Sequence, residues 1–271
     1  MHCQPAPVTG SGGQPTANSQ QLFSSYIYLM HNHFFRFKQF TVYQDRCAMK
    51  VGTDSVLLGA WTRVDYARRI LDIGSGTGLL ALMMAQRTEA EITGIDIDPA
   101  ATEQATENAR NTPWATRLQF KNISFQEYVK EGKQESSLQP FDLLISNPPF
   151  HPEDIKPGSH QRRLARHSDE LSVQEILTLG TAILAPQGRI ALVVPAKIYT
   201  QVLAEAAGAG LSFLRTLAVK PTSQKPVHRY LLEFGFSSQN NIIEELIIEM
   251  NERHDYSPQY RELTRDFYLA F

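Results

Sequence analysis

The sequence predicts an α/β fold with a mostly parallel sheet and helices on both faces. After residue 65, short apolar stretches typical of buried strands alternate with helical stretches of about 10–15 residues. Unusual residue types, mainly Gly, Asp, Asn and Pro, follow the apolar stretches where the strands should end. The chain of 271 residues, 42% hydrophobic and 20% charged, suits one large globular domain or two small ones.

The first three strands, each followed by a helix, are predicted from residue 67 onward. The apolar run at 67–74 is a strand that ends in a glycine-rich turn, and 79–88 has helical spacing of apolar residues. A second strand covers 90–98. The helix at 99–111 opens with Pro99 at a first-turn position and is Ala-rich and amphipathic, and a strand at 117–122 and a short helix at 124–132 follow.

The second half of the chain continues this alternation. The apolar run at 141–146 is the fourth strand, and a helix is expected over 172–185, closed by the turn APQG. The fifth strand covers 189–196 and a helix follows at 199–209. The runs at 211–221 and 227–236 are predicted to form the last strand pair, one strand of which runs antiparallel. The expected sheet therefore has seven strands.

Composition excludes several classes of protein. The net charge of −2 gives no global reason to expect a membrane or nucleic acid as partner. Two cysteines make neither a disulfide framework nor a metal cluster, so we expect a reduced, cytoplasmic protein without a metal. No apolar run approaches the length of a transmembrane helix. We also expect a monomer.

The N-terminal 30 residues differ from the rest of the chain. They are rich in Gln, Pro, Gly and Ser, and residues 1–35 contain no Asp, Glu, Lys or Arg. Such a segment buries too little apolar surface to offset its ordering entropy. We expect either a disordered leader over 1–30 or an extension upstream of a native start at Met30, followed by a single domain over 31–271.

A glycine-rich loop, DIGSGTG at 72–78, separates the first strand from the first helix. Gly74, Gly76 and Gly78 allow a tight turn and a close approach of the backbone to a ligand. Their spacing is G-x-G-x-G, whereas the dinucleotide fingerprint is G-x-G-x-x-G. The loop therefore disfavours a nicotinamide cofactor, and a tight turn without a ligand is the plain alternative.

Two acidic residues frame this loop. Asp96 ends the second strand, 24 residues after Asp72, and a carboxylate there can accept hydrogen bonds from both hydroxyls of a ribose. Asp98 is better explained as the N-cap of the next helix. Asp72 is expected near the ammonium of an amino-acid moiety, or else as an anchor of the loop amides. A nucleoside with an ammonium and no phosphate points to S-adenosylmethionine.

The fourth strand ends in NPPF, at 147–150. The side-chain oxygen of Asn147 and the carbonyl of Pro148 could accept hydrogen bonds from the two N–H groups of an amine. These bonds would favour a pyramidal nitrogen and free its lone pair. Two successive prolines make the turn rigid. Phe150 offers a face for stacking an extruded base. A strand-ending turn with an exposed Phe is the structural alternative.

These motifs together resemble the class I S-adenosylmethionine-dependent methyltransferases, in the branch that methylates exocyclic or amide nitrogens. The resemblance implies a Rossmann-like fold and places Asn122, after the third strand, near the adenine of the cofactor. Many relatives carry Asp at that position. The segment CAMKVGTDSVLLGAW resembles the part that closes over the methionine end, where Lys50 and Thr53 could meet the carboxylate. Thr53 and Asp54 could equally start a helix as caps.

Adenine in DNA, adenine in RNA, guanine N2 in RNA and a protein glutamine are the substrates considered for such a turn. The DNA enzymes usually carry a separate recognition domain, for which this chain has no spare residues. The glutamine enzymes have Tyr after the prolines, where this chain has Phe150. RNA is therefore favoured. Two segments without acidic residues, 156–167 and 215–229, could hold phosphates. The RNA contacts expected in them are Arg162, Arg163, Arg166, Lys220, Lys225 and Arg229. Solvated charge runs are the alternative.

At a finer level, four segments resemble the bacterial tRNA1(Val) adenine-37 N6-methyltransferases over about residues 34–271. They are RFKQFTVYQDRCAMKVGTDSVLLGAW, NPPF with HQRRLARHSDELS, KPVHRYLLEF and YSPQYRELTRDFYL. The resemblance implies methyl transfer from S-adenosylmethionine to N6 of adenine 37 in the anticodon loop of a valine tRNA. The alternatives are an rRNA guanine-N2 methyltransferase and a non-catalytic RNA-binding protein that retains the cofactor fold.

Overall fold

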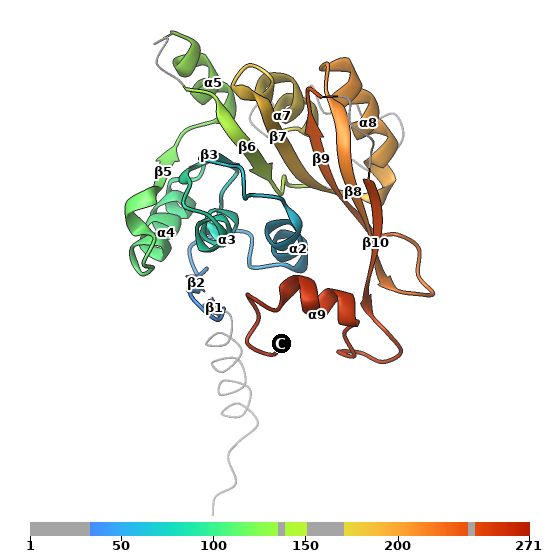
Figure 1. The fold of residues 1–271 in the computed structure, drawn as a ribbon. Helices are drawn as coiled ribbons and strands as arrows, with labels where there is room; N and C mark the ends of the chain where they lie inside the picture. Colours follow the sequence, from blue (N-terminus) through green and yellow to red (C-terminus); the bar gives the residue numbers. More distant parts are fainter. Residues whose placement is uncertain (1–32, 135–138, 151–170, 238–241) are drawn as a thin grey trace, which may run out of the picture.

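The computed structural model describes residues 33–134, 139–150, 171–237 and 242–271 (Figure 1). The expected leader, residues 1–30, lies outside them. The strands are β1 (Phe34–Arg36), β2 (Thr41–Tyr43), β3 (Arg69–Ile73), β4 (Glu91–Asp96), β5 (Leu118–Asn122), β6 (Phe141–Ser146), β7 (Leu184–Pro195), β8 (Ser212–Thr222), β9 (Arg229–Gly235) and β10 (Ile242–Glu249). The helices are α2 (Thr53–Trp61), α3 (Leu79–Arg87), α4 (Pro99–Arg110), α5 (Phe125–Gln134), α7 (Val173–Gly180), α8 (Tyr199–Gly208), α9 (Pro258–Thr264) and the 3-10 helices η1 (Ala115–Arg117) and η2 (Ala196–Ile198).

The main sheet has eight strands in the order β10-β8-β9-β7-β6-β3-β4-β5, and β1 and β2 form a separate hairpin. Neighbouring strands of the main sheet are parallel, except that β9 runs antiparallel to both β7 and β8. The predicted α/β class and its antiparallel strand are therefore confirmed. The strand number was one too low, because β10 pairs in parallel with β8 at the sheet edge.

The fifth strand begins earlier than the sequence predicted. The turn APQG lies inside β7, and the preceding helix α7 ends at Gly180, so the expected helix over 172–185 is too long. Two contacts draw the chain into the sheet: Leu184 pairs with Phe141, and the Phe141 amide donates to the Ile183 carbonyl at 2.8 Å. A register shift after Phe141 accommodates the extra residues. Pairing with β6 thus overrides the local turn signal.

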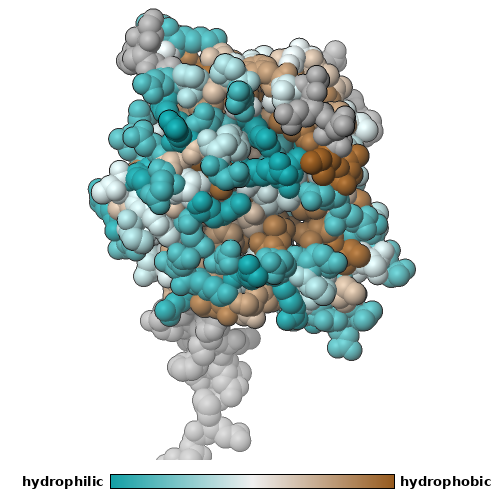
Figure 2. Space-filling model, viewed as in Figure 1, coloured by the Kyte–Doolittle hydropathy of each residue, from teal (hydrophilic) through white to brown (hydrophobic). Residues whose placement is uncertain are grey.

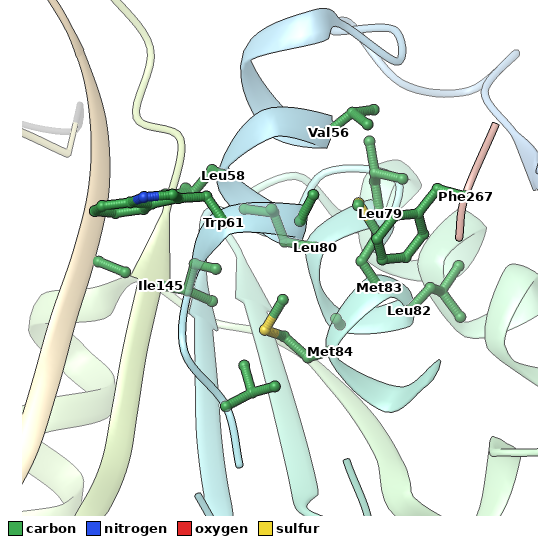
Figure 3. Close-up of a cluster of buried hydrophobic side chains, with 14 of the residues drawn as sticks. Val56, Leu58, Trp61, Leu79, Leu80, Leu82, Met83, Met84, Ile145 and Phe267 are labelled. Carbon is green, nitrogen blue, oxygen red and sulfur yellow. The ribbon is translucent and has the colours of Figure 1, made fainter. Parts of the chain in front are cut away.

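Helices cover both faces of the sheet (Figure 1). Helices α2, α3, α4 and α9 lie on one face, and α5, α7 and α8 on the other. Two buried apolar clusters fill the two layers. In Figure 3, side chains of α2 and α3 interdigitate with Ile145 from the sheet and with Phe267 from the C-terminal segment. Among the described residues, none of the helices has the length and apolar character needed to cross a bilayer.

The register aligns the ends of four strands. Asp72 lies opposite both Gly94 and Ile145, so Gly74, Asp96 and Asn147, each two residues further on, leave the sheet at one level. Asn122 lies directly opposite Asp96. The chain runs from β3 outward to β5 and then returns to β6 on the other side, which makes β3 and β6 the topological switch point. Ligands of such sheets bind outside the carboxyl ends at this point.

Candidate active site

A cavity of about 260 Å³ opens at the carboxyl ends of β3, β4 and β6. It lies between the glycine loop, the segment before α2, the start of α5 and the turn after β6. Among the described residues it is lined by Cys47, Ala48, Met49, Lys50, Val51, Ser55, Ile73, Gly74, Ser75, Gly76, Thr77, Leu79, Leu80, Ile95, Asp96, Ile97, Asp98, Ala101, Ile123, Phe125, Gln126, Asn147, Pro149 and Leu171. The glycine motif and the Asn-Pro motif thus share one site.

The glycine loop has the conformation that its sequence demands. Gly74, Gly76 and Gly78 have φ values of 71°, 50° and 79°, in the left-handed region that other residues rarely adopt. A Cβ at Gly76 would meet no atom within 4 Å, so the loop backbone is open toward the cavity there. A Cβ at Gly78 would lie 3.0 Å from Phe120 and 3.1 Å from Ala105, so that glycine permits close helix–strand packing.

Asp96 is bound to the loop through its side chain. Its Oδ2 accepts from the Gly76 amide at 2.8 Å, and its Oδ1 accepts from the Asp98 amide at 2.9 Å. The carboxylate is half-buried and lines the cavity, so further lone pairs remain for a ligand hydroxyl. The side chain of Asp98 accepts from the Ala100 amide at the N-terminus of α4, which confirms its predicted role as the N-cap.

Three other predicted cofactor residues, Asp72, Gly78 and Asn122, lie outside the cavity lining. Asp72 is completely buried, and its Oδ2 accepts from the Ala81 amide in the first turn of α3 at 3.0 Å. It therefore anchors the helix N-terminus rather than the loop amides. Burial raises the pKa of Asp72 to about 7, against a lowering by the Ala81 hydrogen bond. The exposed Asn122 donates from Nδ2 to the Asp96 carbonyl at 3.0 Å.

The segment 43–51 passes over the cavity and is held by buried amides of α4. Asn108 donates from Nδ2 to the carbonyls of Tyr43 and Thr77 and accepts from the Tyr43 amide, each at 2.9 Å. Gln104 accepts from the Arg46 amide at 3.3 Å. A single side chain, Asn108, therefore links this segment to the glycine loop.

Of the two residues predicted to meet the cofactor carboxylate, Lys50 lines the cavity and Thr53 does not. Lys50 is exposed and lines the cavity, as expected for a group that meets a ligand carboxylate. Thr53 is exposed at the first helical position of α2 and does not line the cavity. The N-cap of α2 is Gly52, and no side chain caps this helix end, so α2 starts as predicted but without the predicted capping.

The turn after β6 reaches the cavity through two of its residues. Asn147 and Pro149 line it, whereas Pro148 is buried and Phe150 packs against the apolar cluster of the α7 face. Asn147 donates from Nδ2 to the Oγ of Ser55 at 2.8 Å. The turn is further fixed by Ser146, whose Oγ donates to the Ile73 carbonyl at 2.6 Å.

The predicted RNA contacts fall into two groups. Arg162, Arg163 and Arg166 lie outside the described residues. In the second segment, Lys225 is exposed in the turn between β8 and β9. Lys220 forms an ion pair with Glu245 at 2.7 Å, and the Nε of Arg229 lies 2.7 Å from the Oδ2 of Asp54.

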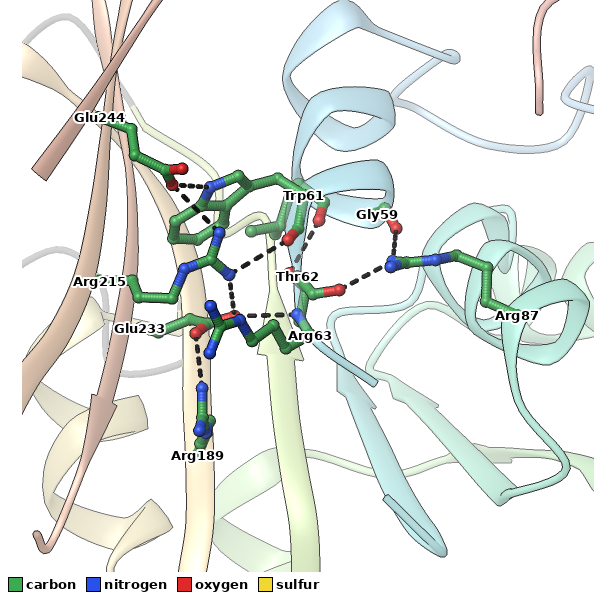
Figure 4. A network of polar contacts seen from close by, with 10 residues as sticks. Gly59, Trp61, Thr62, Arg63, Arg87, Arg189, Arg215, Glu233 and Glu244 are labelled. Atoms are coloured by element: carbon green, nitrogen blue, oxygen red, sulfur yellow. Dashed lines mark hydrogen bonds and ion pairs between the residues drawn. The ribbon is translucent and has the colours of Figure 1, made fainter. Parts of the chain in front are cut away.

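Arg215 is the first residue of the predicted basic segment 215–229. It is buried and belongs to a structural network (Figure 4). Its guanidinium lies 3.4 Å from Glu233 and 3.1 Å from Glu244, and stacks over Trp61 at 4.3 Å. The fully buried Glu233 also pairs with Arg189 at 3.0 Å. The network joins the end of α2 to the sheet, so the segment 215–229 is not a continuous solvent-exposed basic run.

Sequence reasoning missed three residues that shape the site: Ser55, Gln104 and Asn108. Ser55 lies within an apolar stretch that predicts only a helix. Gln104 and Asn108 are four residues apart in α4 and are both buried. Two amides at i and i+4 on the buried side of an Ala-rich helix are a signal that could have been read.

The cavity fits S-adenosyl-L-methionine. The open backbone at Gly76 leaves room for close approach of a ligand, and Asp96 supplies acceptors for a ribose. Two buried polar atoms at the loop, Asp72 Oδ1 and Ser75 Oγ, have no hydrogen-bond partner among the described residues and suit a polar ligand. Within the same residues, no group of three or more His, Cys, Asp or Glu side chains is arranged to hold a metal ion.

Comparison with known proteins identifies the family. The model of the methyltransferase small domain matches residues 47–211. The tRNA1(Val) (adenine(37)-N6)-methyltransferase of Bacteroides fragilis is 43% identical over 240 residues, which cover 89% of this chain and 99% of the relative. The protein of the same name from Christiangramia forsetii is 41% identical over 242 residues, with the same coverage.

Solved structures agree on the fold. A predicted O-methyltransferase from Agrobacterium tumefaciens superposes with a TM-score of 0.60 at 20% identity, covering 79% of this chain and 96% of that one. A methyltransferase from Pyrococcus furiosus gives 0.54 at 19% identity, covering 81% and 99%. With the glycine loop and the Asn-Pro turn on one cavity and this identity over most of its length, the chain belongs to the family of tRNA1(Val) (adenine(37)-N6)-methyltransferases, with S-adenosyl-L-methionine as cofactor.

Proposed function

We propose that this protein methylates N6 of adenine 37 in the anticodon loop of tRNA1(Val), acting as a monomer without a metal. The observation that carries the proposal is the shared cavity, which is lined both by Asn147 and by the glycine loop that marks the cofactor site. The names of the relatives support the substrate. They favour adenine N6 over the guanine-N2 alternative and an enzyme over a non-catalytic RNA-binding protein.

The cofactor is held by residues at the sheet edge. Asp96 would take the ribose hydroxyls, and the backbone of Gly74 and Gly76 would form the floor of the site. Lys50 would take the carboxylate, and the exposed Asn122 would lie on the adenine side. Asp72 acts from beneath the loop, where its unpartnered oxygen favours a nearby ammonium.

The chemistry follows from the acceptors on the turn. When bound, S-adenosyl-L-methionine supplies a methyl carbon attached to a positively charged sulfur. The Asn147 oxygen and the Pro148 carbonyl would accept hydrogen bonds from the two N–H groups of the target amine and direct its lone pair toward that carbon. The N–C bond would then form as the C–S bond breaks and the neutral thioether leaves. Because the Asn147 amide is uncharged, it would not form an ion pair with the positively charged sulfur. Phe150 stacks on the extruded base.

The tRNA backbone is held by cations around this edge. Lys225 is the exposed member of the second segment and contacts phosphate, together with Lys220 and with Arg162, Arg163 and Arg166 as expected from sequence. Binding supplied by such contacts weakens steeply with added salt. Base stacking and the cavity then select the nucleotide.

The direct test is transfer of labelled methyl from S-adenosyl-L-methionine to a tRNA1(Val) transcript. We expect label in N6-methyladenosine after nucleoside analysis, and none in a transcript carrying guanosine at position 37. Label in N2-methylguanosine would support the alternative base. Absence of label in every tRNA, with cofactor binding demonstrated by calorimetry, would contradict the proposed function.

The first prediction concerns the amide itself. Asn147→Ala should lower the rate of methyl transfer by about 10²–10³-fold, as expected when one preorganised polar group is lost from a transition state. Calorimetry should show largely unchanged affinity for S-adenosyl-L-methionine. Asn251→Ala, at an exposed position, is the control and should keep wild-type activity. Loss of cofactor affinity in Asn147→Ala would place this residue in the cofactor site instead.

A further inference from the structure

The first turn of α2 touches the catalytic turn, although the two lie far apart in sequence. Asn147 Nδ2 donates to Ser55 Oγ at 2.8 Å, across 92 residues of chain. Both side chains line the cavity, so the hydrogen bond lies at the wall of the site. Ser55 is thus the side chain that meets the nitrogen end of the Asn147 amide.

In the structure, this contact takes up the nitrogen end of the Asn147 amide. A carboxamide has one end that only donates and one that only accepts. With the nitrogen bound to Ser55, the Oδ1 end is left for a substrate amine. The reversed amide would present two N–H groups to an amine that itself offers N–H groups, and that arrangement cannot activate it. The orientation of Asn147 therefore matters as much as its presence.

The position of Ser55 depends on how the start of α2 is held. The N-cap Gly52 offers no side-chain hydrogen bond, and the first helical bond, from the Val56 amide to the Gly52 carbonyl, is 3.3 Å long. The first amides of any helix lack intrahelical partners, and here the N-cap Gly52 gives them no side-chain acceptor. Another contact on this turn therefore matters for its position.

That contact is the ion pair between Asp54 and Arg229. Arg229 Nε lies 2.7 Å from Asp54 Oδ2, and the two side chains are 24% and 34% exposed. Arg229 is itself fixed, because it begins β9, pairs with Pro195 of β7, and donates from Nη1 to the His228 carbonyl at 3.1 Å. The guanidinium thus points toward α2. An arginine that contacted an RNA phosphate in solvent would not need this geometry.

We propose that Ser55, held in place by the Asp54–Arg229 pair, is the positioning residue that orients the Asn147 amide toward the substrate amine. This inference rests on the proposed function, and it reassigns Arg229 from phosphate contact to positioning. The order of contacts runs from β9 through Arg229 and Asp54 to Ser55 and then to the catalytic turn.

The first experiment replaces the hydroxyl. Ser55→Ala should lower the single-turnover rate constant of methyl transfer about 3- to 10-fold, the effect of one hydrogen bond. The affinity for S-adenosyl-L-methionine and the KM for tRNA should stay at wild-type values. Ser55→Thr keeps a hydroxyl and should restore most of the rate. A wild-type rate in Ser55→Ala, or a loss of cofactor affinity equal to the loss of rate, would overturn the proposal.

The second experiment separates positioning from RNA binding with a matched pair of variants. Arg229→Gln should lower the single-turnover rate constant and leave the KM for tRNA unchanged, whereas Lys225→Gln should raise KM and leave the rate constant unchanged. Asp54→Asn, which removes the same ion pair, should behave as Arg229→Gln does and serves if that variant does not fold. A raised KM alone in Arg229→Gln would make Arg229 an RNA contact and refute the positioning unit.

Failure of the proposed function can be distinguished from failure of the positioning unit. Wild-type protein is assayed first, and absence of transfer to tRNA counts against the proposed function. Transfer by the wild type, with Ser55→Ala and Asp54→Asn equally active, counts only against the positioning unit.

Discussion

At the scale of single residues, the buried carboxyl group of Asp72 below the glycine loop lowers the stability of the folded protein when it is charged. Its carboxyl group is completely buried, and only one of its oxygens has a partner among the described residues. Burial disfavours the charged form and raises the pKa from 3.8 to about 7, and Asp96 adds to the shift. The charged form of this carboxyl group is therefore unfavourable in the folded protein.

The charge of Asp72 predicts a pH dependence of stability. Because its folded pKa is raised, the native state binds more protons than the unfolded state between about pH 4 and pH 7, and stability falls as pH rises through this window. Asp72→Asn removes this titration and still accepts from the Ala81 amide. The cofactor-free variant should therefore gain stability over wild type between pH 4 and pH 8, by up to about 4 kcal/mol.

Urea unfolding at pH 4, 6 and 8 measures this difference. Asn251→Ala, which changes no titratable group, is the control and should leave the pH profile unchanged. Calorimetry should show that Asp72→Asn binds S-adenosyl-L-methionine more weakly, since the carboxylate that favours the ammonium is gone. Parallel pH profiles of wild type and Asp72→Asn would show that Asp72 has the same pKa in the folded and unfolded protein, and would contradict the raised pKa.

At the scale of elements, β10 is the strand that local sequence did not predict. Its sequence IIEELIIE lacks a clear alternation, and Leu246 is its one buried residue. Ile242 and Ile243 are 45% and 68% exposed, and Figure 2 shows hydrophobic side chains gathered on the side of the molecule where β10 lies. Pairing with β8, rather than its own pattern, makes this segment a strand.

Two alanine substitutions test the place of β10 in the sheet. Leu246→Ala should lower the free energy of unfolding by about 2–5 kcal/mol, because Leu246 is 4% exposed and packs in the core. Ile243→Ala should change it by less than about 0.5 kcal/mol, because its side chain is mostly in solvent. Chemical denaturation gives both values. Equal effects of the two substitutions would be incompatible with this register.

At the scale of the whole molecule, the two ends of the described chain close one side of the core. Phe37, after β1, stacks on Phe40 and on Tyr268, and its neighbour Lys38 donates from Nζ to the carbonyls of Arg265 and Phe271. Phe267 of the C-terminal segment lies beside Leu79, Leu82 and Met83 of α3, as Figure 3 shows. We propose that residues 31–271 therefore unfold as one domain.

Phe267 gives this proposal a measurable consequence. Phe267→Ala should cost about 3–5 kcal/mol, because the ring is 2% exposed and its loss leaves a cavity next to α3. Leu269→Ala, two residues further on and 60% exposed, is the matched control with little expected effect. Circular dichroism and tryptophan fluorescence should follow one coincident transition in all three proteins. Two separated transitions would indicate two domains.

Much of the site could be predicted because its signals are local. A glycine with positive φ, an aspartate that caps a helix and an amide that ends a buried strand act on neighbours in the chain, so Gly74, Asp98 and Asn147 can be read one segment at a time. The contacts of Arg215 and Arg229 could not be read in this way. A basic side chain looks the same in sequence whether it faces a phosphate or a buried glutamate.

The sequence by itself determined the α/β alternation, the glycine loop and the position of the Asn-Pro turn at a strand end, since short-range sterics and apolar periodicity decide these features. The tertiary structure alone decided which distant segments meet: Ser55 with Asn147, Asp54 with Arg229 across 175 residues, and β10 with β8. These pairings follow from the order of strands in the sheet. That order is set by the burial of the whole core, which no single segment encodes.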